Sequence, residues 1–137
     1  MIQRSPLIRR RANRGKKTSK RRRSRLALRR ECDRVFAVAV KDRDGWACRA
    51  CGSHMHPQCA HLVSRRYHAT RWDLLNAVCL CSGCHVRWTH DPIAWEDWCE
   101  ERFPGRLVGL KVRARAGVAH IDYEAILASL VGGGKLE

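Results

Sequence analysis

The order of apolar and polar residues predicts helices around a short pair of strands. Between about residues 24 and 40, apolar residues from Leu26 to Val40 recur with charged residues between them, a spacing that suits a helix with one buried face. Cys32 is expected to be an ordinary core residue of that helix. Two apolar segments at 59–63 and 76–80 have the composition of strands and are expected to pair as a hairpin. Further helices are predicted at about 84–89, 92–99 and 122–130.

The last two of these helices carry additional signals. Pro92 is favourable at a helix start, and the apolar residues Trp95, Trp98 and Cys99 follow at i, i+3, i+4 spacing. The two tryptophans are therefore expected to be core residues rather than a platform for stacking bases. Asp122 is expected to cap the final helix. The intervening segment, 106–116, is basic and mixed in pattern, and no element is predicted for it.

The N-terminal 30 residues have a different composition from the rest of the chain. They contain 14 of the 28 Lys and Arg residues and no acidic residue. Because like charges repel and few apolar residues are available for burial, this arm is expected to be disordered until it binds phosphate. Arg21, Arg22 and Arg23 are candidate DNA contacts within it. A solubilising tail and a localisation signal are the alternative interpretations of the same composition.

The formal net charge of the whole chain is +15, with only 13 acidic residues. Such a balance predicts a polyanionic partner, and nucleic acid is the commonest one. A membrane surface is the alternative, but the basic segment lacks the apolar face that an interfacial helix needs. No apolar run reaches the roughly 18 residues of a membrane span, and no signal-peptide core precedes residue 31. We therefore expect a cytoplasmic protein.

Four of the 8 cysteines form two Cys-x-x-Cys pairs, Cys48 with Cys51 and Cys81 with Cys84. Each pair places two thiolates on one turn, and four thiolates satisfy the tetrahedral preference of Zn²⁺. We expect one structural zinc site, in which Gly52 lets the backbone turn back toward the metal. Disulfides are the alternative, but disulfide frameworks belong mainly to secreted proteins. His54 and His56 are expected to be exposed loop residues, with spare metal ligands as the alternative.

Between and after these cysteine pairs lie further residues that a structural zinc site does not need. With the cysteines, they make the segment 46–92 resemble the HNH endonucleases, or ββα-metal nucleases, specifically small phage-type members built on two Cys-x-x-Cys knuckles. The resemblance is carried by Cys48, Cys51, Ala60-His61, Arg71-Trp72-Asp73, Asn76, Cys81, Cys84-His85 and His90-Asp91-Pro92.

The resemblance implies an α+β fold, with a zinc-stabilised ββα core at about 46–92 and flanking helices at 92–131. The nuclease domain would span residues 31–131 and be followed by a flexible tail at 132–137. It also implies a metal-dependent endonuclease that hydrolyses DNA phosphodiester bonds. The catalytic set would be His61, Asn76 and His85: His61 as the general base, Asn76 bracing the hairpin, and His85 binding a catalytic Mg²⁺ or Mn²⁺ ion. The alternative for His61 is a buried strand residue held by a backbone hydrogen bond.

One position departs from the family pattern. Many members carry Asp or His directly before the base as a second metal ligand, whereas this chain has Ala60. Water would fill that position, or His90, Asp91 or His68 would reach it.

Further DNA contacts are expected from the basic and aromatic segment at 64–73. The candidates there are Arg65, Arg66 and Arg71. The alternative to the nuclease is a catalytically silent, zinc-stabilised module that binds nucleic acid through its arm.

Overall fold

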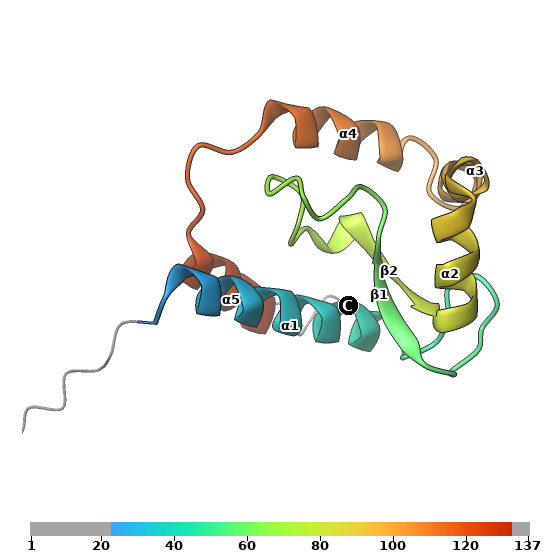
Figure 1. The fold of residues 1–137 in the computed structure, drawn as a ribbon, viewed down its shortest axis with the longest axis horizontal. Coiled ribbons are helices and arrows are strands. Elements are labelled where there is room, and N and C mark those ends of the chain that lie inside the picture. The colour runs from blue at the N-terminus through green and yellow to red at the C-terminus, as the bar shows by residue number, and fades with distance from the viewer. Residues whose placement is uncertain (1–22, 133–137) are drawn as a thin grey trace, which may run out of the picture.

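The computed structural model describes residues 23–132, which form a mixed α+β fold with a two-stranded sheet and five α-helices (Figure 1). The predicted α+β fold class is confirmed. In chain order the elements are α1 (Arg25–Arg43), β1 (Pro57–His61), the 3₁₀ turn η1 (Leu74–Asn76), β2 (Ala77–Cys81), α2 (Ser82–His90), α3 (Pro92–Arg102), α4 (Arg106–Ala116) and α5 (Tyr123–Gly132).

The sheet is an antiparallel hairpin with a long connection between its strands. Ala60 of β1 lies opposite Val78 of β2, and His61 lies opposite Ala77. Just beyond the paired residues, the N–H of Leu62 donates to the carbonyl oxygen of Asn76 at 2.8 Å, which closes the end of the hairpin. Helix α2 starts directly after β2, so the chain runs strand, strand, helix without a linker before the helix.

Each face of the hairpin is covered by helices, because successive residues of β2 point to opposite sides. Ala77 packs with Phe36 and Val40 of α1 and with Tyr123 of α5. Val78 and Leu80 pack on the other side with residues of α2, α3 and α4. Figure 1 shows the hairpin between the paired helices α1 and α5 and the helices α2 to α4. The sheet is thus the middle layer of three.

All four predicted helices are present, and the two predicted strands are shifted by one or two residues. Cys32 is fully buried, as predicted. Asp122 accepts a hydrogen bond from the N–H of Ala125 at 3.0 Å, which confirms its role as a helix cap. Trp95 and Trp98 stack on one another and against the buried Trp88, as expected for core residues.

One boundary and one helix differ from the prediction. Helix α1 begins at Arg25, so residues 25–30, which the composition places in the arm, are helical; Ser24 caps them by accepting from the N–H of Ala27 at 3.1 Å. Residues 1–22 and 133–137 lie outside the described part of the chain. Helix α4 has no counterpart among the predicted elements. It follows Gly105, whose φ of 73° allows the tight turn after α3.

Candidate functional site

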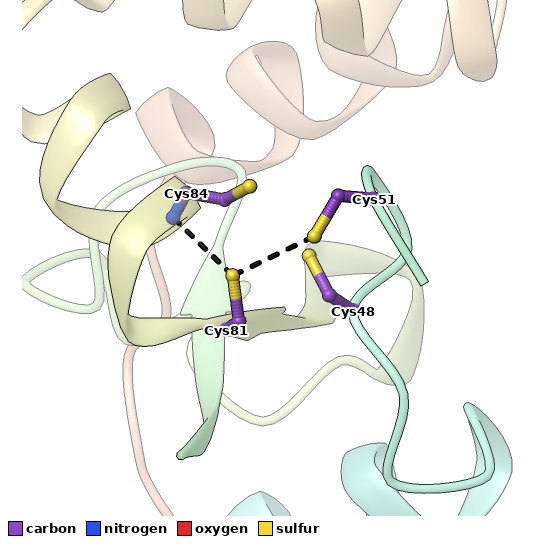
Figure 2. Close-up of side chains that lie close together, drawn as sticks. All are labelled: Cys48, Cys51, Cys81 and Cys84. Atoms are coloured by element: carbon purple, nitrogen blue, oxygen red, sulfur yellow. Dashed lines mark hydrogen bonds between the residues drawn. The ribbon is translucent and has the colours of Figure 1, made fainter. Parts of the chain in front are cut away.

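The four cysteines of the two Cys-x-x-Cys pairs come together at one end of the hairpin. Cys48 and Cys51 lie on a tight loop in which the N–H of Gly52 donates to the carbonyl oxygen of Cys48 at 2.8 Å. Gly52 has a φ of 76°, a left-handed conformation that favours glycine. Cys81 ends β2 and Cys84 lies in the first turn of α2. Figure 2 shows the four side chains converging from these two segments.

The spacing of the four sulfur atoms suits a metal ion. All four Sγ atoms lie within 4.8 Å of one another, and those of Cys51 and Cys81 are 3.7 Å apart. A tetrahedral site with metal–sulfur bonds of about 2.3 Å has sulfur–sulfur edges of about 3.8 Å. The cluster could therefore hold a metal ion such as zinc. Within residues 23–132, no other group of three His, Cys, Asp or Glu side chains converges in this way.

The thiols of the cluster differ in acidity. Burial opposes ionisation of Cys48, but backbone hydrogen bonds from Cys81, Cys51 and Ala50 outweigh it and lower its pKa to about 7. Burial, together with hydrogen bonds among the thiols, raises the pKa of Cys84 to about 12. A bound cation would ionise its thiol ligands outright, so metal binding to this cluster would release protons.

The two loop histidines near the cluster are not part of it. His54 and His56 are both exposed, as predicted, and Nδ1 of His54 lies 3.1 Å from the carbonyl oxygen of Trp46. The four remaining cysteines lie in or against the core. Burial raises the pKa of Cys59 and of Cys99 to about 12, so these thiols stay protonated and inert.

His61, the predicted base, is held in one orientation at the end of β1. Its Nε2 donates to the carbonyl oxygen of Arg71 at 2.9 Å, and its ring stacks on Phe36 at 5.3 Å between centroids. A carbonyl oxygen can only accept, so Nε2 carries the proton of the neutral ring and Nδ1 keeps its lone pair. The free nitrogen is the one that could take a proton from water.

The surroundings of His61 favour this neutral form. Burial disfavours the imidazolium ion and lowers the pKa of His61 below its usual value, assisted by the positive charges of Arg71 and Arg65. The hydrogen bond to the Arg71 carbonyl and the charge of Asp33 act in the opposite direction and are outweighed. The imidazole is therefore uncharged at neutral pH.

The carbonyl that orients His61 is itself fixed by an ion pair that the sequence did not reveal. Arg71 donates to Asp33 of α1 through Nε at 2.8 Å and through a terminal nitrogen at 2.6 Å. Its other terminal nitrogen donates to the carbonyl oxygen of Arg65, and the indole N–H of Trp72 donates to Asp33. These bonds outweigh the effect of burial and lower the pKa of Asp33. Asp33 thus positions the segment that holds His61.

This ion pair also corrects one predicted DNA contact. Arg71 is buried, and its guanidinium group is bound to Asp33 and to the backbone. It is not free to bind phosphate, and its role is structural. The sequence does not reveal this role, because the partner of Arg71 lies 38 residues away along the chain.

Replacing Asp33 with Asn should lower the free energy of unfolding by about 1–3 kcal/mol, because Arg71 would lose a charge-assisted partner. Urea unfolding followed by tryptophan fluorescence measures the change. The matched control is Asp97→Asn on the exposed side of α3, which should change stability by less than about 0.5 kcal/mol. Equal stability of the two variants would contradict the structural role of the ion pair.

His85, the predicted metal ligand, lies near the start of α2. Its Nδ1 is 2.5 Å from Oε1 of Gln58, a residue of β1. Because the amide oxygen accepts, Nδ1 is the donor and Nε2 of the neutral ring keeps a lone pair. A metal-binding histidine usually has its second nitrogen held in this way.

The structure brings His61 and His85 to the same place. Both line a pocket of about 240 Å³ with Ala60 and Trp88, and both line an adjoining pocket of about 430 Å³ with Asp33 and Arg65. The two pockets lie along β1, next to α2 on one side and α1 on the other. The predicted base and the predicted metal ligand therefore share one open groove.

Asn76 does not reach this groove. It is completely buried, and its Oδ1 accepts from the N–H of Val63 at 2.8 Å. Its amide nitrogen donates to the carbonyl oxygens of Val63 and Thr70 at 3.0 and 2.9 Å. These bonds brace the connection between the strands.

None of the candidates for the additional metal ligand joins His85. His90 is exposed at the end of α2, and Asp91 caps α3 by accepting from the N–H of Ala94 at 3.0 Å. His68 stacks on Trp72. Ala60 is only 3% exposed and contributes no ligand atom. His85 is thus the one histidine of this set placed next to His61 in the groove.

The remaining predicted DNA contacts differ in their availability. Arg65 is exposed and lines the larger pocket beside His61. Arg66 is exposed and donates to the hydroxyl of Tyr67 at 2.7 Å. Arg23 is exposed and pairs with Glu31, while Arg21 and Arg22 fall outside the described residues. Among the candidates that the structure describes, Arg65 is therefore the one that lines the groove.

Comparison of the chain with protein-family models, curated proteins and solved structures finds no match. None of the helices within residues 23–132 has the length and apolar character needed to cross a membrane.

Proposed function

We propose that this protein is a metal-dependent endonuclease of the HNH class that hydrolyses DNA, with zinc in the four-cysteine cluster. The observation that carries the proposal is the orientation and protonation of the His61 ring. Its ring is fixed by the Arg71 carbonyl, uncharged at neutral pH, and faces the groove that it shares with His85. The strand, strand, helix order of β1, β2 and α2 is the arrangement that the resemblance implies.

In the proposed reaction, Nδ1 of His61 takes the proton from the attacking water. His85 would hold a Mg²⁺ or Mn²⁺ ion through Nε2, and this ion would stabilise the charge that develops on the phosphate and on the leaving oxygen. Asp33 and Arg71 keep the imidazole in one orientation, and Asn76 holds the loop that contains Arg71. Arg65 is placed to contact phosphate at the edge of the groove.

The second candidate function is a silent module that binds nucleic acid and does not cut it. Ala60 favours it, because this position supplies no ligand, and among the described residues no three His, Cys, Asp or Glu side chains converge in the groove closely enough to hold an ion. A catalytic ion held by one histidine would depend on water and substrate for its remaining ligands.

Nicking of supercoiled plasmid separates the two functions. Protein that already contains its zinc should nick DNA only after Mg²⁺ or Mn²⁺ is added, and should stop when a chelator removes that ion. DNA binding without nicking at any concentration of either ion would reject the nuclease and favour the silent module.

The acidity of His61 predicts the pH dependence of cleavage. The rate at saturating metal should rise with pH as the imidazolium loses its proton, and the midpoint should lie below the unperturbed value of about 6.5, because burial lowers this pKa. Rates measured from about pH 5 to 8 show on which side of this value the midpoint lies. The exposed-histidine variant His54→Gln should have the same profile. A midpoint above the unperturbed value would contradict the assignment.

A further inference from the structure

A third pocket lies on the opposite edge of the hairpin from His61. It measures about 230 Å³ and is lined by the side chains of Arg43, Asp44, Arg49 and Arg106, with Val78 and Phe103 as its apolar wall. It is formed where the end of α1, the cysteine loop and the turn between α3 and α4 meet beside β2. None of these residues lines the groove of His61 and His85.

The one carboxylate in this pocket, that of Asp44, is already paired with an arginine side chain. The side chain of Asp44 is only 2% exposed, and Arg43 donates to both of its oxygens at 2.8 and 2.9 Å. Asp44 also accepts from the N–H of Cys79 at 2.8 Å, which fastens it to β2. The remaining nitrogen of Arg43 donates to the carbonyl oxygen of Leu74. Arg43 and Asp44 therefore form a fixed wall of the pocket.

The other two arginines have donors to spare. The closest approach of Arg49 to Asp44 is 4.0 Å, which is too long for a hydrogen bond, and its side chain is 39% exposed. Arg106 lies over the ring of Phe103 at 4.0 Å, and within residues 23–132 it forms no ion pair. Burial and then the charges of Arg43 and Arg49 lower the pKa of Arg106, as expected where positive charges crowd together.

We propose that this pocket binds a phosphate group through the guanidinium groups of Arg49 and Arg106. The planar fork of arginine matches phosphate oxygens, and stacking on Phe103 holds one fork in place. The volume is several times the roughly 30 Å³ that a water molecule occupies in the liquid, which leaves room for a phosphate group. The ligand is either a free phosphate or a phosphate of a nucleic-acid backbone. The inference does not require that the protein cut DNA.

The test compares two double variants of the full chain that lose the same charge. Arg49→Gln with Arg106→Gln removes the proposed donors. Arg34→Gln with Arg102→Gln is the control, because both of these arginines are exposed and line neither this pocket nor the groove of His61. Circular dichroism confirms folding, and Arg49→Gln alone provides a milder variant, since the Arg49 side chain forms no hydrogen bond within the described residues.

The first probe is inorganic phosphate, titrated by calorimetry. If the pocket binds free phosphate, the wild type and the control bind one equivalent, and the pocket variant binds roughly tenfold or more weakly. The second probe is duplex DNA, with affinity measured against salt. If the pocket binds a backbone phosphate, the pocket variant loses about 0.9 from the slope of log affinity against log salt for each contact, relative to the control.

Either result supports the proposal and identifies the source of the phosphate. Equal binding by the two double variants in both assays, or failure of the wild type to bind either probe, would overturn it. Because both readouts measure binding, they are independent of whether His61 supports cleavage.

Discussion

Replacing Cys48 with Ser should abolish binding of the proposed zinc and unfold the hairpin region, with a larger loss of stability than either Asp33→Asn or Cys99→Ser. Cys48 and Cys51 lie on a loop joined to the rest of the fold mainly through β2, by the bond from the N–H of Arg49 to the carbonyl oxygen of Cys79 and by the cluster. Structural zinc contributes roughly 10–16 kcal/mol of apparent binding free energy in small zinc domains. In a fold with one two-stranded sheet, a contribution of this size would decide whether the hairpin region folds.

The matched control is Cys99→Ser, which makes the same chemical change at another buried cysteine. It should cost about 1–3 kcal/mol by burying a hydroxyl group, but the protein should keep one zinc per chain. Metal analysis and thermal unfolding with and without chelator measure the difference. Adding the chelator should lower the unfolding temperature of Cys99→Ser and should not change that of Cys48→Ser. A folded Cys48→Ser protein that retains one zinc would contradict a four-thiolate site.

The features that could be predicted from the sequence are those that depend on local spacing. Each Cys-x-x-Cys pair forms one turn, and two such turns can share a cation wherever the hairpin brings them together. The helix starts at Pro92 and Asp122 are equally local, because a cap requires only the residues of the first turn. These signals do not depend on which distant segments meet.

Helix α4 could not be predicted, because exposed apolar residues obscure the helical spacing of its buried ones. Its buried residues Leu107, Leu110 and Ala114 have helical spacing, but Val108 and Val112 are equally apolar and are 63% and 62% exposed. A sequence that is apolar on two faces does not reveal which face is buried. Which face of α4 is buried depends on its packing against α3 and the loop after β1.

The contacts that orient His61 could not be predicted from the sequence for a different reason. Asp33, Arg71 and His61 lie on three separate segments, and only the folded chain places the Arg71 carbonyl against the imidazole. One signal was available, since Asp33 is an acidic residue next to the buried stripe of a helix in a strongly basic chain. Such a residue tends to be paired, but the sequence does not name its partner.

Replacing His61 with Ala should lower the cleavage rate by about 10²–10⁴-fold while zinc content and DNA affinity stay nearly unchanged. A general base acts on the transition state and contributes little to binding of the substrate. Because the ring also packs on Phe36, the larger substitution His61→Gln serves as a second variant that leaves less empty space. The exposed-residue control His54→Ala should retain full activity. Full activity in a folded His61→Ala protein would remove the base from the mechanism.

Replacing His85 with Ala should also lower the cleavage rate, but in a way that depends on the metal concentration. His85 is proposed to bind the catalytic ion, so its loss should raise the Mg²⁺ or Mn²⁺ concentration required for half-maximal rate, and part of the activity should return at high Mn²⁺. Added metal cannot restore a missing base, so the His61 variants should not recover. Metal titrations of the wild type, His61→Gln and His85→Ala, each followed by plasmid nicking, separate the two roles. Recovery of both variants at high Mn²⁺ would mean that His61 acts through the metal rather than as the base.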